Sequence, residues 1–477
     1  MTDQTLEYFY QLAKIPRKSG HEQAAAEFLM QFAQKHGLEA EKDEQNNVII
    51  RKPASVGCEN APTVIIQGHT DMVCESAPGV EKDFLTEGID VYEEEGWIKA
   101  RGTSMGGDDG LAVAMALSIL DDNSLTLPAL ECVFTTNEET GMDGANALDY
   151  SKLKGTMMLN LDTEDEGVFC ISSAGGGATL ASLPIRRTKS VKKSTVRMVL
   201  GGMKGGHSGV EIHKNRINGI SAAGRVLYAL AQEVKPELVS FQGGKAHNSV
   251  PNRVEVVLNI MPEQKQQLME VAQKAVDEIC AEFPTDQCAL EWEDMSHQWD
   301  VWDDASTQRL IHFLMVMPTG VLRMSSLLEN FVDLSQNIGT AKQHDDEIVF
   351  EISVRCGQRH AVLHQMEKNA VLTRLAGGTA QNGGVYPGWA YREHSPLRDM
   401  ACQLFEEMYG YPAKAEGIHA GLECGYFYEA LQQQEIDIIS YGPNMRDIHS
   451  FHERAEIASI HRVYEFTVRL LERIAKG

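Results

Sequence analysis

The chain has no hydrophobic run long enough to cross a membrane. A transmembrane helix needs roughly 18 or more consecutive apolar residues, and every apolar stretch among the 477 residues is interrupted sooner. The first residues, MTDQTLEYFYQLAKIPRKSG, also lack the apolar core of a secretory signal peptide. We therefore predict a cytoplasmic protein with no membrane partner.

Cysteine is sparse and positive charge is outnumbered. The nine cysteines are an odd number and form no Cys-x-x-Cys pair, which argues against a disulfide scaffold and predicts reduced thiols. Lys and Arg number 43 against 68 Asp and Glu, a net charge of −25. Because nucleic acids and anionic membranes repel so acidic a chain, we predict neither as a partner.

Two nucleotide-binding motifs are also missing. The sequence contains no dinucleotide fingerprint and no P-loop, so redox and phosphoryl-transfer chemistry find no support. What remains is a composition typical of globular proteins, 43% hydrophobic and 23% charged. A chain of 477 residues exceeds what one hydrophobic core usually serves, which predicts two domains.

The first part of the chain alternates between strands and helices. Residues 63–67, 130–136 and 156–161 are short apolar runs typical of buried strands, and residues 111–120 read as a helix. Ser19 to Glu22 form a plausible capping box for a helix that Gly37 ends. This alternation predicts the α/β class, with a mixed, mostly parallel sheet and helices on both faces.

The middle of the chain has a different character. After a glycine-rich segment it alternates strands with amphipathic helices over roughly 200 residues, which predicts an inserted α+β unit at 176–389. The first pattern then resumes, with a strand at 436–443. We therefore predict a discontinuous catalytic domain, residues 1–175 and 390–477, interrupted by the inserted unit.

Acidic residues and histidines follow the predicted strands. Function in open α/β sheets collects at the carboxyl ends of strands, and five short motifs fall there: His69-Thr-Asp71, Asp108-Asp109, Glu138-Glu139, Asp162 and His449. Taken singly, each has an ordinary explanation, such as a surface histidine, a solvated acidic pair, a turn or a helix cap.

Together, the five motifs favour hydrolysis. Two imidazoles and three carboxylates suit two divalent metals that share one bridging carboxylate. One Asp and one Glu then remain, enough to orient a ligating histidine and to act as a general base. Asp71 falls on the same side of an extended segment as His69, so it is placed to orient that imidazole.

The motifs resemble those of a known family. In order, GHTDMV, GGDDG, TNEETGMDGA, NLDTE, GGHSG, HAGLECG and HSFHER are similar to the zinc dipeptidases called aminoacyl-histidine or cytosol non-specific dipeptidases. These belong to the larger co-catalytic zinc family of carnosinases, peptidase T and aminoacylases. The resemblance covers essentially the whole chain. It implies a two-zinc α/β domain with an inserted lid domain.

The resemblance also implies roles for the residues of the metal site. Asp71 would lie behind His69, Glu138 would be the general base, and the Asp108–Asp109 peptide bond would be cis. Two Zn²⁺ per chain, replaceable by Co²⁺ or Mn²⁺, would be held by His69, Asp108 as the bridge, Glu139, Asp162 and His449.

In the lid, the resemblance implies that His207 reaches over the scissile carbonyl. Asn248, Arg355 and the backbone near Gly421 would hold the carboxylate of a small dipeptide, although a surface salt bridge explains Arg355 equally well. The lid would also form a homodimer, which raises the alternative that His207 serves the neighbouring subunit's site.

Several points stay open at this stage. The sequence departs from close relatives at His452, a second imidazole three residues after His449, and at Asp109, where Asn is common. His213 and His419 have no assigned role. The predicted function is a dipeptidase of broad specificity, Xaa-His type. The alternatives are an aminoacylase, a carboxypeptidase, a tripeptidase or an inactive metal- or peptide-binding relative, although none of the motif residues is missing.

Overall fold

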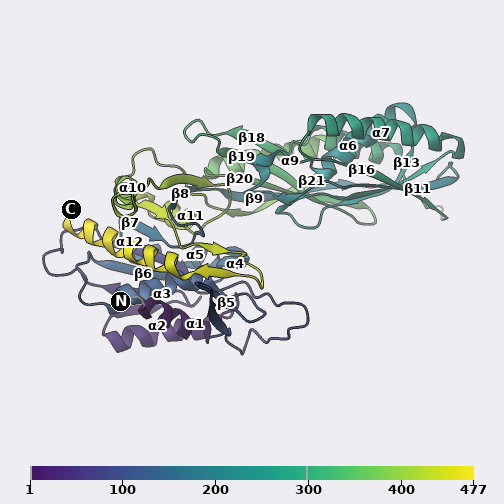
Figure 1. Cartoon of the computed structure of the whole chain (residues 1–477). Helices are drawn as coiled ribbons and strands as arrows, with labels where there is room; N and C mark the ends of the chain where they lie inside the picture. Colours follow the sequence, from purple (N-terminus) through teal and green to yellow (C-terminus); the bar gives the residue numbers. More distant parts are fainter. Residues whose placement is uncertain (1–2, 297–298) are drawn as a thin grey trace. The chain divides into compact units, whose positions relative to one another are not determined.

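A computed structural model describes residues 3–296 and 299–477 (Figure 1). The chain forms two compact units. The first contains the chain up to Ser172 together with Tyr391–Gly417 and Glu423–Gly477, and the second contains Ser173–Ala390. Ile418–Leu422, which the sequence-based division left with the catalytic domain, groups with the second unit. The roles of the second unit as a lid and in dimerisation stay predictions.

The first unit is built on a mixed eight-stranded sheet. Its four central strands, β6, β3, β7 and β23, run parallel, whereas β1, β2 and β8 pair antiparallel. The predicted α/β class with a mostly parallel central sheet is therefore confirmed. In sheet order the strands are β1 (Glu39–Lys42), β2 (Val48–Lys52), β6 (Leu130–Thr135), β3 (Val64–His69), β7 (Met157–Asn160), β23 (Asp437–Ser440), β8 (Val168–Ser173) and β22 (Lys414–Ile418).

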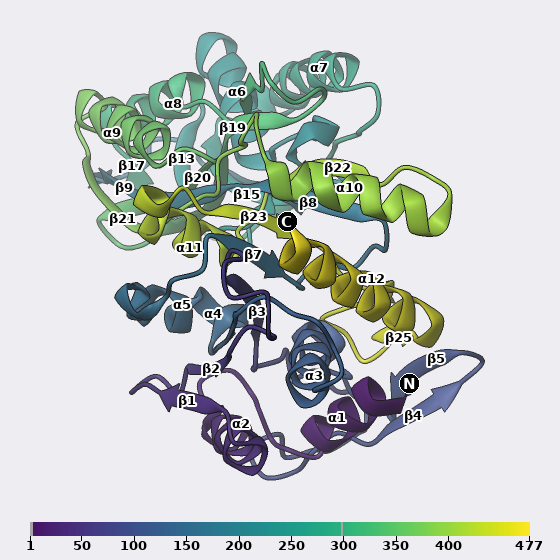
Figure 2. The ribbon, with the colours of Figure 1, turned by 90° about the vertical axis from the view of Figure 1, so that its left-hand side faces the viewer.

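Five long helices pack in this unit. α3 is buried over almost its whole length and contacts both β3 and α1, because its sequence is apolar on all sides. α10 and α12 lie side by side (Figure 2). The long helices are α1 (Asp3–Ala13), α2 (Gln23–His36), α3 (Gly107–Asp121), α10 (Pro396–Tyr409) and α12 (Ile457–Lys476).

Short elements complete the first unit. They are the helices α4 (Glu138–Gly141), α5 (Asp143–Ala147) and α11 (Cys424–Ala430), and a small sheet of β24 (Met445–Arg446), β25 (Arg454–Glu456), β5 (Trp97–Ala100) and β4 (Val91–Glu94). Among the described residues, no helix combines the length and the apolar character that crossing a membrane requires. None of the nine cysteines, all of which lie in the described residues, forms a disulfide.

The capping box predicted at Ser19 is wrong. α2 begins at Gln23 and has no side-chain cap, although Gly37 ends it in the left-handed conformation as predicted. The Ser19 hydroxyl instead donates to Asp71, and the Glu22 carboxylate accepts from the backbone N–H groups of Gly20 and Asn137. These polar side chains serve loops distant in sequence rather than their own helix end.

The second unit is an antiparallel sheet with four helices against one face (Figure 1). In sheet order the strands are β16 (Ala289–Met295), β11 (Ser194–Gly201), β15 (Val254–Ile260), β13 (Glu237–Gly243), β19 (Val332–Gln343), β20 (Glu347–Cys356), β9 (Gly175–Pro184) and β21 (Thr379–Tyr386), with β18 (Gly320–Met324) also paired to β19. The helices are α6 (Gly219–Glu233), α7 (Lys265–Glu282), α8 (Asp304–Val316) and α9 (Arg359–Leu375).

Strand β20 shows how the second unit forms its core. Ile348, Phe350 and Ile352 alternate along the strand and are buried in the apolar cluster shared with the helices. Residues at the odd-numbered positions, such as Ser353 and Arg355 further along the strand, lie on the opposite face, because side chains alternate along a strand. The sheet therefore has one apolar face and one polar face at this strand.

Replacing Phe350 by Ala tests this core. The side chain is fully buried and its ring centroid lies 4.9 Å from that of Phe313. We expect Phe350→Ala to lower the free energy of unfolding by about 3–5 kcal/mol, measured by urea denaturation, because a cavity replaces the ring. Leu375→Ala, at a side chain that is 80% exposed, should stay within about 0.5 kcal/mol of wild type. Equal losses in the two variants would contradict the assigned packing.

Candidate metal centre

Three of the five predicted metal ligands, His69, Glu139 and Asp162, follow neighbouring strands of the first unit. The prediction of a strand end is wrong for the other two, because Asp108 lies at the start of α3 and His449 lies in the loop between β24 and β25. His69 ends β3, and Asp162 follows β7, which runs parallel to β3. Glu138 and Glu139 begin the short helix after β6, the other parallel neighbour of β3. Because the carboxyl ends of parallel strands meet at one edge of a sheet, these side chains converge there.

Asp108 lies between two imidazoles. Its Oδ1 atom is 3.2 Å from Nε2 of His69, and its Oδ2 atom is 3.0 Å from Nε2 of His449. Each carboxylate oxygen thus faces a different histidine. This is the arrangement that a carboxylate bridging two metal ions requires.

A second carboxylate accompanies each histidine. Oδ1 of Asp162 lies 3.8 Å from Nε2 of His69, and Oε2 of Glu139 lies 3.1 Å from Nε2 of His449. Ligand atoms of Asp108, Glu139 and His449 all lie within 4.8 Å of one another. Asp108 therefore lies close to both histidines, and Asp109 also has a ligand atom within 4.8 Å of those of His69 and Asp162.

The structure also separates the two candidate imidazoles at 449 and 452. His449 contacts Asp108 and Glu139, whereas the ring of His452 lies against Phe451, with a centroid distance of 4.2 Å. Within the described parts of the chain, His452 makes no ion pair with the clustered carboxylates. The structure therefore favours His449 over His452 as the candidate ligand.

The residues present fit divalent metal ions. Oε1 of Glu139 is buried without a hydrogen-bond partner among the described residues, which leaves a lone pair for a cation. Burial, together with neighbouring carboxylates, raises the pKa of Glu138 to about 8 and that of Asp162 well above its ordinary value, although the positive charge of His69 opposes both shifts. Imidazole nitrogen and carboxylate oxygen suit transition-metal ions such as zinc.

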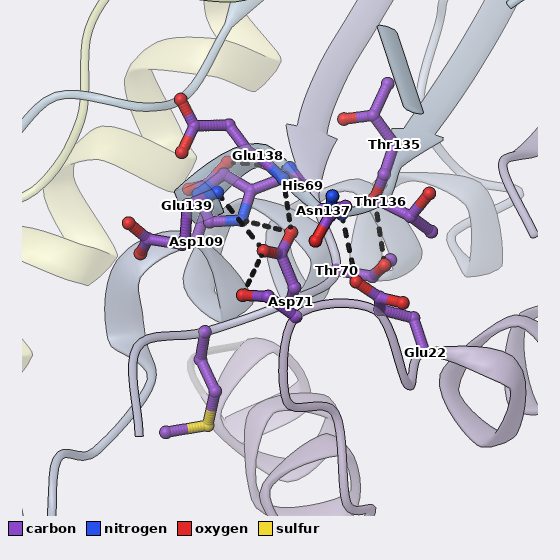
Figure 3. Close-up of polar contacts among 12 residues, drawn as sticks. Glu22, His69, Thr70, Asp71, Asp109, Thr135, Thr136, Asn137, Glu138 and Glu139 are labelled. Carbon is purple, nitrogen blue, oxygen red and sulfur yellow. Dashed lines mark hydrogen bonds and ion pairs between the residues drawn. The ribbon is translucent and has the colours of Figure 1, made fainter. Parts of the chain in front are cut away.

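Asp71 supports two parts of the site at once (Figure 3). Its Oδ1 atom lies 3.3 Å from Nδ1 of His69 and accepts the backbone N–H of Glu138 at 3.0 Å, and Oδ2 accepts the N–H of Glu139 at 3.2 Å. Burial alone would raise its pKa, but His69 and Ser19 outweigh burial and hold the pKa of Asp71 below its ordinary value. The ionised carboxylate thereby fixes both the imidazole and the Glu138–Glu139 turn.

Glu453 is a site residue that the sequence analysis missed. Its buried carboxylate accepts four backbone N–H groups, those of Met105 at 2.7 Å, Gly106 at 2.9 Å, Gly107 at 2.8 Å and Asp108 at 3.3 Å. It therefore holds the loop that presents Asp108. The cis bond expected between Asp108 and Asp109 is confirmed.

Arg17 was missed as well. The side chain is only 1% exposed, and Nη1 donates to the carbonyl oxygens of Thr70 at 3.2 Å and Asp71 at 3.1 Å. Nη2 donates to the carbonyl of Gly106. Arg17 thus joins the loop after β3 to the loop before α3.

Glu453 lies in the HSFHER motif, but its partners are 345 to 348 residues away, and the sequence gives no sign of such contacts.

Asp109 points into the protein rather than adding an exposed charge. It is 1% exposed, and its Oδ2 atom accepts the backbone N–H of His69 at 3.2 Å. Gly68 leaves space for it, because a Cβ atom there would lie 2.6 Å from that oxygen. The carboxylate packs against the strand end that carries His69.

The predicted substrate residues lie in the second unit. Nδ1 of His207 accepts the N–H groups of Gly209 and Val210, both at 3.2 Å, so the neutral ring carries its proton on Nε2. The backbone carbonyl of Asn248 accepts the N–H of Ser208, and Gly421 belongs to Ile418–Leu422. Arg355 donates to the Tyr386 hydroxyl at 3.0 Å and makes no salt bridge to any described residue, so the surface salt-bridge alternative is not observed.

Replacing Glu453 by Gln should weaken metal binding. A glutamine amide has one acceptor oxygen and presents N–H groups to N–H groups, which loosens the loop bearing Asp108. We expect about a 10- to 100-fold loss of metal affinity, the range for groups that support metal ligands, measured by competition with a chelator. Glu465→Gln, which removes the same charge from an exposed position on α12, should leave the affinity unchanged. Equal affinities in the two variants would refute the role of Glu453.

Metal affinity should rise with pH. Hydrogen bonds to Asp108 and Glu139 raise the pKa of His449 to about 11, so the metal-free imidazole is protonated at neutral pH. A metal ion displaces this proton, and the association constant should increase about tenfold per pH unit for each proton released. Chelator competition between pH 6 and 8 measures the slope, which should decrease in His449→Gln. A slope near zero in wild type would show that no proton is displaced.

Comparisons with known proteins agree with this site. Residues 65–473 match the profile of "Peptidase family M20/M25/M40". The chain is 30% identical to the cytosol non-specific dipeptidase of Escherichia coli (strain K12) over 473 residues, which cover 98% of this chain and 96% of that protein.

Solved structures are similar as well. The aminoacylhistidine dipeptidase of Vibrio alginolyticus has a TM-score of 0.91 and 31% identity, covering 98% of this chain and 96% of that one. A tripeptidase of Staphylococcus aureus, at 14% identity and a TM-score of 0.57 over 100% of this chain and 99% of that one, shares the fold. The chain therefore belongs to peptidase family M20/M25/M40, as a metallopeptidase that hydrolyses peptide bonds.

Proposed function

We propose that this metallopeptidase is a dipeptidase that cleaves short, unblocked dipeptides of broad sequence, Xaa-His among them, in the cytoplasm. The observation that carries the proposal is the sharing of Asp108 between His69 and His449, with Glu138 beside them. The two similar relatives bear the names of dipeptidases and align over nearly the whole chain.

The proposed cofactor is two Zn²⁺ per chain, which Co²⁺ or Mn²⁺ replaces. His69 and Asp162 would hold one ion, Glu139 and His449 the other, and Asp108 both. When bound, such ions supply a water of lowered pKa and polarise the peptide carbonyl.

Glu138 is proposed as the general base. It follows β6 immediately, its backbone N–H is held by Asp71, and its side chain is directed away from Asp71 (Figure 3). Glu138 takes a proton from the attacking water and delivers it to the leaving amine. Asp71 keeps the turn and the His69 ring in place while the proton moves.

The second unit is proposed to recognise the substrate. His207, with its proton on Nε2, donates to the oxygen that becomes negative during attack. Arg355, Asn248 and the backbone near Gly421 bind the terminal carboxylate, which limits substrates to very short peptides. We also propose that two chains form a homodimer through the second unit. Sedimentation of the purified protein measures the mass of the assembly, which should be twice the 52.8 kDa of one chain.

A pair of adjacent variants tests the proposal. Glu138→Gln should keep two metal ions per chain but lower kcat on a dipeptide panel that includes carnosine and Gly-Gly by about 10²- to 10⁴-fold, because only the proton acceptor is lost. Glu139→Gln, one residue on, should lose metal instead. Metal content by elemental analysis and steady-state rates separate the two effects.

Two results would contradict the proposal. Full activity in metal-loaded Glu138→Gln would remove Glu138 as the base. A metal-loaded wild type that cleaves no dipeptide but cleaves N-acyl amino acids would replace the dipeptidase by an aminoacylase.

A further inference from the structure

The polar face of the second unit carries an ordered row of positions across four strands, three with a side chain and one with a glycine. Ser335 on β19 pairs with Arg355 on β20, Arg355 pairs with Gly176 on β9, and Gly176 pairs with Tyr386 on β21. Residues directly opposite one another in a sheet project to the same face. The row therefore reads Ser335, Arg355, an empty position and Tyr386.

The empty position lets Arg355 and Tyr386 meet across β9. Nη1 of Arg355 donates to the Tyr386 hydroxyl at 3.0 Å, across the strand that carries Gly176. A Cβ atom at Gly176 would lie 2.6 Å from that hydroxyl. Glycine at this position is thus required for Tyr386 to reach and hold the guanidinium.

His419 extends the row on its other side. Its Nε2 atom forms a 2.7 Å hydrogen bond with the Ser335 hydroxyl, and the side chains of both residues are buried. Burial, together with the positive charge of Arg355, lowers the pKa of His419 to about 3, so the imidazole is neutral. Ser335 and His419 form a neutral hydrogen-bonded pair beside the arginine.

Gly209 marks the point where these groups converge. A Cβ atom there would lie 2.5 Å from the carbonyl oxygen of His419, 2.9 Å from Cε1 of His207 and 3.2 Å from Nε of Arg355. The loop carrying Asn248 is held on the same polar face, because Asn337 and Ser353 both donate to the carbonyl of His247. Three separate segments, which carry His207, Arg355 and His419, therefore meet at one position.

Two buried polar atoms around this point, Nε of Arg355 and Oγ of Ser208, have no partner within the described ranges. Buried polar groups are rarely left unpaired. Both atoms are able to donate a hydrogen bond, and Arg355 has no carboxylate partner in the described chain. We therefore expect the missing partner to be a negatively charged hydrogen-bond acceptor.

We propose that Tyr386 and the Ser335–His419 pair are positioning residues that hold Arg355 in a closed pocket specific for the terminal carboxylate of the substrate. This inference rests on the proposed dipeptidase function and extends it to three residues without a role so far. A carboxylate accepts hydrogen bonds from the guanidinium. A C-terminal amide or a continuing peptide chain instead places an N–H group, itself a donor, next to the donors of the pocket, so neither side is satisfied. The pocket accordingly selects peptides that end one residue after the scissile bond.

The test compares a dipeptide with its own amide. Wild type should hydrolyse Ala-His with a kcat/KM about 10- to 100-fold above that for Ala-His-amide, the range for hydrogen bonds to a charged group. Arg355→Met should abolish the preference. Tyr386→Phe and Ser335→Ala should each lower it about tenfold by reducing kcat/KM for the acid alone. Tyr228→Phe, at an exposed tyrosine on α6, should keep the full ratio.

Equal losses on the acid and the amide in Tyr386→Phe and Ser335→Ala would overturn the proposal, because a purely structural defect affects both substrates alike. Binding of L-histidine and L-histidinamide to the metal-loaded protein, measured by calorimetry, gives a readout without hydrolysis. A preference for histidine that these variants reduce supports the pocket even if the proposed peptidase activity fails. Equal binding of the two probes, or none, refutes the pocket.

Discussion

Mutual repulsion among buried carboxylates is the constraint on which the first unit depends. Asp108, Asp109 and Asp162 are clustered with Glu138 and Glu139 at one sheet edge, and burial raises the pKa of several of them. Such a cluster is stable only when positive charge is present, as imidazolium in the metal-free chain or as divalent cations when they bind. The repulsion between these carboxylates opposes folding of the metal-free chain, and it favours metal binding because bound cations relieve it.

The scaffold withstands this repulsion through the backbone. The Glu453 carboxylate accepts four backbone N–H groups of the loop that carries Asp108. The Arg17 guanidinium donates to backbone carbonyls of two loops, the one after β3 and the one before α3. Both charges are buried, and both are satisfied mainly by main-chain dipoles rather than by direct pairing with the metal ligands. Two loops that would otherwise separate are therefore fixed without consuming the carboxylates that bind metal.

The charge in the second unit has the opposite sign to that of the carboxylate cluster. Its polar face gathers donors around Arg355, with His419 neutral and Tyr386 and Ser335 uncharged, so it attracts one negative group where the first unit attracts cations. Sheet register creates this row, since cross-strand neighbours share a face and Gly176 leaves one place empty.

The sequence by itself determined the α/β class, the strands that end at His69 and before Asp162, and the motifs that supply the ligands. These follow from local patterns, because buried parallel strands are apolar and their carboxyl ends carry the functional residues. Only the tertiary structure decided that His449 rather than His452 faces Asp108, that Ser19 serves Asp71 instead of a helix, and that Ile418–Leu422 joins the second unit. Arg17, Glu453 and His419 were equally hidden, because their partners are brought near by folding and no local periodicity encodes a hydrogen bond between segments distant in sequence.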